Sequence, residues 1–387
     1  MKKIVFIAIA LTFSLSLVAQ ETGMHFEHDA TWQQILDKAK KENKFIFLDA
    51  YASWCGPCKW MAKEVFPKKE VGDAINPNYV NAKIDMEKGE GIELAKKYNV
   101  RNYPTYLFFN ANGELVHRSL GSIPAEDFIL LCNNTLLPSH QFVTLKNNYE
   151  KGQRDTAFLR NYAMQANLAQ DETAQPALKE FLQAAKYQLS PANLELIYGM
   201  VNTIQDTGYS IIKANKQAFI NHFGEKTIAT LEEDLVWLEA KKAGKKGTDK
   251  AAFKKVIQQY LPEKTDLLCV EYDLSLLKRA GNWSAYLPKA EKFATDFCQN
   301  DWERLNNIAN NFFENYSTKS VLQKGLKISL RSVAVHPNYM NLLTTAQLYQ
   351  KMKDKVNAKL YAEKALQITT ADTSERNEVE AFMKSLK

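Results

Sequence analysis

The chain has 387 residues, of which 45% are hydrophobic, so it is too long for one ordinary domain and two or three domains are expected. Its 50 basic and 44 acidic residues leave a formal charge of only +6, and no compact basic patch with interleaved aromatic residues stands out. The sequence therefore argues against nucleic-acid binding.

The first residues have the pattern of a targeting signal. An apolar run from Ile4 to Ala19 follows Lys2 and Lys3 and ends at the polar Gln20. Such a run is shorter than the roughly 20 residues that a membrane-spanning helix needs. We therefore predict a signal peptide over residues 1–19, with an uncleaved signal anchor as the alternative. The mature protein is expected to be exported, to the periplasm or the cell envelope.

Helix and strand signals alternate from His25 to Leu137. A first helix is expected to be capped by Asp29, with apolar positions at Trp32, Leu36 and Ala39. Strands are predicted over Phe45–Leu48, Tyr79–Met86, Thr105–Phe109 and Glu114–Leu120, and further helices over Pro57–Phe66, Gly91–Tyr98 and Pro124–Leu136. This mixture predicts a compact α/β domain over residues 25–137.

After Pro138 the strand signals stop, and residues 142–387 have the pattern of successive amphipathic helices. Near the end, Ala346, Ala358 and Ala365 are 12 and 7 residues apart, so two antiparallel helices could approach closely there. This spacing resembles a tetratricopeptide repeat. We expect an all-α, repeat-like domain, with weaker units over residues 268–293 and 305–337; a plain helical bundle is the alternative.

The chemistry centres on the motif Trp54-Cys55-Gly56-Pro57-Cys58, which directly follows an apolar strand and begins a helix. The thiolate is the reactive form of cysteine, and unpaired N–H groups at a helix N-terminus stabilise it. Cys55 takes that position. Cys58 follows one turn later and can reach back to the Cys55 sulfur, so the pair can close a small ring and open it again.

Other uses of the five cysteines are less favoured. A zinc site is disfavoured because no second Cys-x-x-Cys or matching His pair is visible, so no metal and no cofactor beyond the Cys55–Cys58 disulfide is expected. A permanent structural disulfide is disfavoured because the loop is short and placed for reactivity. Cys132 is expected to be a buried, inert thiol. Cys269 and Cys298 could pair, and sequence alone leaves this open.

Three segments make residues 25–137 resemble the thioredoxin family: Asp49–Cys58, Val100–Thr105 and the closing hairpin. Lys59, Met61 and Phe66 make the domain most similar to the exported bacterial branch, such as the C-terminal domain of DsbD. The resemblance implies a thioredoxin fold that exchanges thiols with protein disulfides. It implies substrate contacts from Trp54, Gly56, Pro57, Tyr103 and Pro104.

The resemblance also implies roles for three further residues. Pro104 matches the cis-proline that would expose the backbone of Tyr103 to an extended substrate segment. Asp49, six residues before Cys55, matches a buried acid that can accept the proton of Cys58; an ordinary strand-end carboxylate is the alternative. Lys83 matches the lysine that partners this acid, although the alignment there tolerates a shift.

Three departures from the family leave substrate choice open. Residues 68–78 form an extra segment after the motif helix and residues 86–91 are lengthened, while Tyr103 replaces the usual aliphatic residue. The Gly-Pro pair resembles reducing thioredoxins, which favours a reductase over an isomerase or an oxidase. An exported reductase implies an electron-donating membrane partner. The alternative is an interaction scaffold whose helical region binds a protein partner and whose redox role is secondary.

Overall fold

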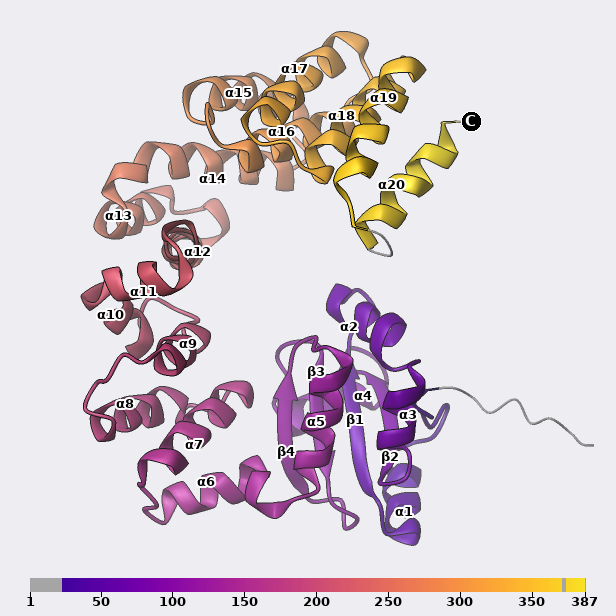
Figure 1. Ribbon diagram of the computed structural model, residues 1–387, viewed down its shortest axis with the longest axis vertical. Coiled ribbons are helices and arrows are strands. Elements are labelled where there is room, and N and C mark those ends of the chain that lie inside the picture. Colours follow the sequence, from indigo (N-terminus) through magenta and orange to yellow (C-terminus); the bar gives the residue numbers. More distant parts are fainter. Residues whose placement is uncertain (1–22, 371–373, 387) are drawn as a thin grey trace, which may run out of the picture. The chain divides into compact units, whose positions relative to one another are not determined.

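The computed structural model describes residues 23–370 and 374–386, and the chain divides into two compact units, Met1–Phe223 and Gly224–Lys387 (Figure 1). The signal peptide predicted over residues 1–19 lies outside the described residues. Within the described residues, no helix combines the length and the apolar character needed to cross a membrane.

The first unit contains a four-stranded sheet in the order β2-β1-β3-β4. Its strands are β1 (Phe45–Tyr51), β2 (Tyr79–Asp85), β3 (Thr105–Phe109) and β4 (Leu115–Leu120). Strand β1 pairs in parallel with β2 and antiparallel with β3, and β3 and β4 form an antiparallel hairpin. The predicted strands are confirmed, and β1 runs three residues beyond the predicted end at Leu48.

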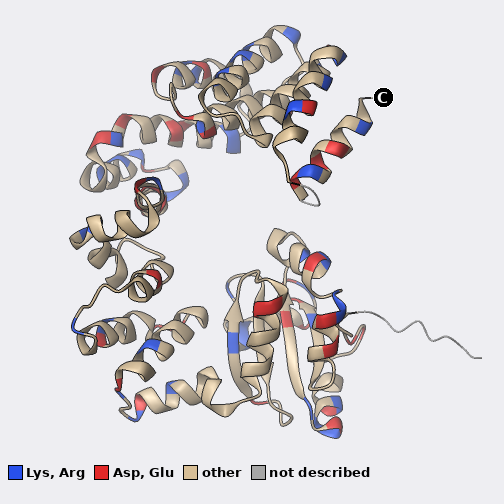
Figure 2. Ribbon diagram, viewed as in Figure 1, with Lys and Arg blue, Asp and Glu red and all other residues tan. Residues whose placement is uncertain are grey.

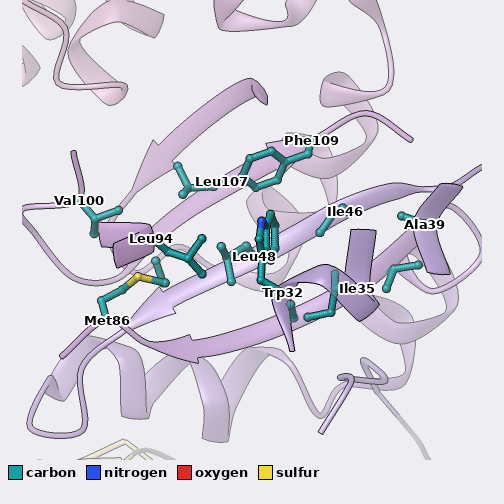
Figure 3. Close-up of a cluster of buried hydrophobic side chains, with 13 residues drawn as sticks. Trp32, Ile35, Ala39, Ile46, Leu48, Met86, Leu94, Val100, Leu107 and Phe109 are labelled. Atoms are coloured by element: carbon teal, nitrogen blue, oxygen red, sulfur yellow. The ribbon is translucent and has the colours of Figure 1, made fainter. Parts of the chain in front are cut away.

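Helices cover both faces of this sheet, because successive side chains of a strand point to opposite faces. Helices α1 (Trp32–Glu42) and α4 (Gly91–Lys97) supply side chains to one apolar cluster, in which the Trp32 and Phe109 ring centroids are 5.0 Å apart (Figure 3). The opposite cluster contains residues of η1 (Met61–Val65), α3 (Lys69–Ile75) and α5 (Ala125–Thr135). The α/β fold expected for residues 25–137 is thus confirmed.

The start of α1 differs from the prediction. Thr31, not Asp29, caps the helix: the Thr31 hydroxyl accepts a hydrogen bond from the Gln34 N–H, and the Gln34 side chain accepts one from the Thr31 N–H. This reciprocal capping box satisfies two N–H groups that would otherwise lack partners. Asp29 instead has a left-handed backbone, with φ 58°.

The helix predicted over Pro57–Phe66 consists of two parts. It begins as α2 (Gly56–Trp60) and continues as the π-helical segment η1, whose last residue lies two positions before Pro67. The extra segment predicted after it forms α3, which buries Val71 and Ile75 in the sheet core.

Helices continue from the sheet to the end of the first unit. They are α6 (Phe142–Glu150), α7 (Thr156–Leu168), α8 (Ala174–Ala184), α9 (Pro191–Gly199), α10 (Thr207–Ala214) and α11 (Lys216–Phe223). Helices α6 and α7 contact strand β4, where the Phe142 N–H donates to Nδ1 of the buried His117 over 3.0 Å. Burial lowers the pKa of His117 to about 4, which keeps this nitrogen free to accept. The domain boundary between residues 137 and 142 stays a prediction.

The second unit is helical throughout its described residues. Its helices are α12 (Glu225–Ala243), α13 (Lys250–Tyr260), α14 (Thr265–Arg279), α15 (Trp283–Asp296), α16 (Trp302–Asn315), α17 (Lys319–Val335), α18 (Tyr339–Lys351), α19 (Lys355–Ile368) and α20 (Ser374–Ser385). Acidic and basic residues are interspersed along these helices (Figure 2). The all-α class expected after the sheet is confirmed.

The packing of α18 against α19 agrees with the spacing of small residues in the sequence. Ala346, Ala358 and Ala365 are fully buried, and the rings of Tyr349 and Tyr361 stack with centroids 5.5 Å apart. The weaker predicted units correspond to the packed helix pairs α14–α15 and α16–α17. Assignment of these pairs to the tetratricopeptide class stays a prediction.

Candidate active site

Cys55 and Cys58 form a disulfide at the start of α2, with their Cα atoms 5.3 Å apart. Cys55 is the N-cap residue of the helix, and its sulfur accepts a hydrogen bond from the Cys58 N–H at 3.1 Å. Pro57 lies in the first turn, where its missing N–H is not needed. Both cysteines are only 2% exposed, so accessibility does not distinguish them, whereas the N-cap position does.

Two aromatic residues adjoin the disulfide on the surface. Trp54 is 65% exposed, and its ring meets that of Tyr103 edge-on with centroids 5.9 Å apart. Tyr103 packs against the buried cluster that contains both cysteines, and it precedes Pro104 through a cis peptide bond. The predicted substrate-contact residues Trp54 and Tyr103 therefore lie together beside the cysteine pair.

Sequence reasoning missed Glu87, which holds Trp54 in place. The Trp54 indole N–H donates to Oε2 of Glu87 at 2.9 Å. Burial raises the pKa of the Tyr103 phenol, and the charges of Glu87 and Asp85 add to this rise. The lengthened segment over residues 86–91 was the signal that could have pointed to this contact, because Glu87 lies in it.

Asp49 and Lys83 form an ion pair beneath the surface. They occupy directly paired positions of the parallel strands β1 and β2, and the Lys83 ammonium contacts Oδ2 of Asp49. The Asp49 side chain is fully buried, and burial raises the pKa of its carboxyl group although the Lys83 charge opposes this. Lys83 therefore contacts Asp49, the residue that the resemblance gave as its partner.

Tyr106 is a further buried polar residue that the sequence analysis did not single out. It lies on β3 directly opposite Asp49 and is fully buried. Among the described residues, neither its hydroxyl group nor Oδ1 of Asp49 has a hydrogen-bond partner. The sequence did contain a signal for it: Tyr106 carries a hydroxyl group directly before the apolar residues Leu107–Phe109 of a predicted strand.

The remaining cysteines are free thiols. Cys132 and Cys298 are buried, and burial raises the pKa of Cys298 to about 12. Cys269 is partly exposed, and it is not paired with Cys298, a question that the sequence had left open. Over residues 23–370 and 374–386, no three His, Cys, Asp or Glu side chains gather as metal ligands would.

The fold and this disulfide define a class of protein. Residues 32–135 match the model of the family described as Thioredoxin-like domain. This part of the chain is thus a thioredoxin-like domain with a Cys-x-x-Cys disulfide, the arrangement of a thiol-disulfide oxidoreductase.

Similar proteins match the same domain. Thioredoxin-2 of Pyricularia oryzae is 36% identical over 107 residues, which cover 28% of this chain and 58% of that protein. Thiol:disulfide interchange protein DsbD of Vibrio cholerae is 40% identical over 86 residues, covering 22% of this chain and 14% of that protein. A solution structure from Bacteroides thetaiotaomicron, provisionally named a disulphide-isomerase, is 42% identical with a TM-score of 0.28 and covers 30% of this chain and 97% of that one.

The matches to the thioredoxins and to the DsbD protein cover only part of each of those proteins. The chain spans 54% to 64% of the length of four thioredoxins that it matches. The family match ends at residue 135, before α6 begins.

Proposed function

We propose that the protein is an exported thiol-disulfide reductase that acts on protein substrates. The observation that carries this proposal is the position of Cys55, which caps α2 beside the exposed Trp54 and is bonded to Cys58. A helix N-terminus stabilises a thiolate, so the cap position favours Cys55 as the nucleophile.

The reaction has two displacement steps. The Cys55 thiolate attacks one sulfur of the substrate disulfide, which breaks that bond and releases the first substrate thiolate to take up a proton. Cys58 then gives its proton to the Asp49 carboxylate, and its sulfur attacks the Cys55 sulfur of the mixed disulfide. The second substrate thiolate leaves and is protonated. The substrate has gained two electrons, and Cys55 and Cys58 are oxidised to their disulfide.

Substrate binding uses the surface around this pair. An extended segment of the substrate pairs with the backbone of Tyr103, next to Pro104, in a form of strand addition. Trp54 supplies an apolar contact that Glu87 orients, and Gly56 and Pro57 form the short loop between the sulfurs. Lys83 holds Asp49 in place through their ion pair.

The motif supports the proposed direction of electron flow. The Gly-Pro pair between the cysteines is that of reducing thioredoxins, which favours reduction over isomerisation or oxidation of substrates. Each turnover leaves the Cys55–Cys58 disulfide, so an electron-donating thiol-disulfide partner in the membrane restores the dithiol. The similarity to a thiol:disulfide interchange protein supports a partner of this kind.

A second function is favoured by the packed helix pairs. Stacked helix pairs such as α16–α17 and α18–α19 commonly present extended binding surfaces. The helical region would then bind a protein partner, and the thioredoxin-like domain would act on that partner or have a secondary redox role.

Trapping of mixed disulfides tests the leading proposal. The full chain should reduce insulin when dithiothreitol supplies electrons, and Cys55→Ser should abolish this activity. Cys58→Ser should accumulate a mixed disulfide at Cys55. Cys269→Ser is the matched control, because this partly exposed free thiol lies outside the motif, and it should behave as the wild type. Insulin reduction that survives Cys55→Ser would refute the proposal.

A further inference from the structure

Three polar side chains form a row across the sheet. Lys83, Asp49 and Tyr106 occupy directly paired positions on the neighbouring strands β2, β1 and β3. Paired residues on adjacent strands point to the same face, with Cβ atoms about 5 Å apart in an antiparallel pair. The side chain of Asp49 therefore has Lys83 on one side and Tyr106 on the other.

The two sides of Asp49 differ in what they provide. Lys83 contacts Oδ2, whereas Oδ1 has no hydrogen-bond partner among the described residues. The Tyr106 hydroxyl likewise has none there, and both side chains are fully buried. A buried polar atom without a partner is costly and rare in folded proteins, so two such atoms on paired residues call for a common explanation.

Packing explains the ring of Tyr106 but not its hydroxyl. The ring centroid lies 5.6 Å from that of Phe47 and 5.7 Å from that of Phe128, contacts that a phenylalanine would also make. The next aromatic residue on the same face of β3 is Phe108. The oxygen atom is thus the feature that packing leaves unexplained.

The surroundings of the Tyr106 hydroxyl keep it protonated, so that it can donate a hydrogen bond. Burial raises the pKa of the Tyr106 phenol, and the negative charge of the Asp49 carboxylate raises it further. Lys83 on β2 is the cation that faces Asp49. Tyr106 therefore keeps its proton at physiological pH, and Asp49 is the acceptor on the paired strand.

We propose that Tyr106 is a positioning residue for Asp49: its hydroxyl donates to a water molecule that in turn donates a hydrogen bond to the free carboxylate oxygen. This bond favours the ionised carboxylate, the form that accepts the proton of Cys58 in the second step. The inference rests on the proposed function only for that step, since the bond itself is independent of turnover.

A hydrogen bond to the charged form of an acid lowers its pKa, so removal of the hydroxyl raises it. Tyr106→Phe removes one oxygen and keeps the ring. We expect the titration of Asp49 to move upward by about one pH unit, a size typical of one bond to a carboxylate. The pH at which release of the mixed disulfide becomes fast should move upward with it.

The direct test is a titration of Asp49 in the oxidised full chain. Aspartate labelled with 13C at Cγ gives the carboxyl signal, and Asp49→Asn assigns it. Tyr79→Phe is the matched control: it also removes a buried hydroxyl, one that donates to the Cys132 carbonyl over 2.6 Å. This control should leave the Asp49 titration unchanged. Tyr106→Leu, which also lacks the hydroxyl, replaces Tyr106→Phe if the latter does not fold.

The outcomes separate the two proposals. An Asp49 titration that coincides in wild type and Tyr106→Phe overturns the inference, whether or not the protein reduces disulfides. A wild-type chain that reduces no insulin refutes the proposed function, while an upward shift of the titration still supports the hydrogen bond. Addition of Tyr106→Phe to Asp49→Asn should not slow release of the mixed disulfide further, and a further slowing would show that the hydroxyl acts elsewhere.

Discussion

The sheet of the first unit and the helices of the second each contain buried or partly buried ion pairs, but the two sets of ion pairs are arranged differently. In the second unit, Arg304 of α16 contacts Glu233, Glu271 and Asp301, and Lys264 also contacts Glu233. Each of these carboxylates therefore has a cation beside it. In the first unit, the fully buried Asp49 has Lys83 on one oxygen and no partner on the other among the described residues.

The pKa directions of Glu233 and Asp49 differ accordingly, whereas burial raises the pKa of Glu271 although Arg304 opposes this. Burial alone would raise the pKa of Glu233, but hydrogen bonds from Lys264 and Arg304 lower it below the usual range. Burial raises the pKa of Asp49, and Lys83 does not overcome it. A buried carboxylate whose pKa is raised can take up a proton, and this property is expected at a reactive site when the carboxylate lies beside a reactive group.

The largest expected effect is on the Arg304 cluster. Arg304→Ala leaves three carboxylates without their shared cation, so the second unit should lose about 3 kcal/mol of stability in urea unfolding. Lys226→Ala is the control, because the Lys226–Glu303 pair is exposed and should contribute less than about 1 kcal/mol. Insulin reduction should be unchanged in both. Equal losses in the two variants would show that the Arg304 cluster is no more than a surface ion pair.

The next effect is kinetic and concerns Asp49. Asp49→Asn removes the proton acceptor of Cys58, so release of the mixed disulfide should slow about 100-fold, while its formation stays the same. Stopped-flow quenching separates the two steps. If both rates fall together, or neither changes, Asp49 is not the proton acceptor.

The same substitution should change stability in a pH-dependent way. Because the pKa of Asp49 is raised in the folded state, the folded protein binds this proton more tightly than the unfolded chain. Its contribution is fully present below the unfolded pKa of about 3.9 and is lost as the pH rises through the folded pKa. Asp49→Asn should therefore stabilise the oxidised protein by on the order of 1 kcal/mol at pH 8 and by nothing near pH 4. A constant difference between these pH values would contradict the burial effect.

The smallest effect is expected from removal of the helices. A fragment covering Gln20–Ser139 should fold and reduce insulin within about twofold of the full chain, since α5 closes its core. The free energy of unfolding of this fragment should be lower by about 1 kcal/mol, because His117 no longer accepts a hydrogen bond from the Phe142 N–H. A second fragment that ends at Phe223, the end of the compact unit, keeps this bond and is the control. An unfolded shorter fragment beside a folded longer one would place α6 and α7 within the catalytic domain.

The sequence predicted most of the sheet because local patterns determine strands and turns. Strand β3 has the predicted bounds, Thr105–Phe109, and the Asn112-Gly113 turn joins it to β4. The end of β1 was missed because Asp49 interrupts the apolar run. The strand nevertheless continues through Asp49, which pairs with Lys83 on β2. Thr31 was missed as the cap because Asp29 is also a good capping residue.

The site was predicted in part, and the limit is again physical. The cysteine motif is local, and its position at the start of α2 followed from the sequence. The position of Tyr106 opposite Asp49 depends on the register between strands and could not be inferred, whereas the contact of Lys83 with Asp49 was implied by the family resemblance. The Trp54–Glu87 hydrogen bond and the contact of α6 with β4 join residues far apart in the chain and required the structure.

The most direct test of the account is the order in which the reduced cysteines react. The full chain, reduced and then exposed to substoichiometric iodoacetamide at about pH 6, should be alkylated first at Cys55, because a helix N-terminus lowers the pKa of the thiol that caps it. Peptide mass spectrometry identifies the labelled residue. Predominant labelling of Cys55 is the predicted result; earlier labelling of Cys58, or of the partly exposed Cys269, would contradict the assignment of Cys55 as the nucleophile.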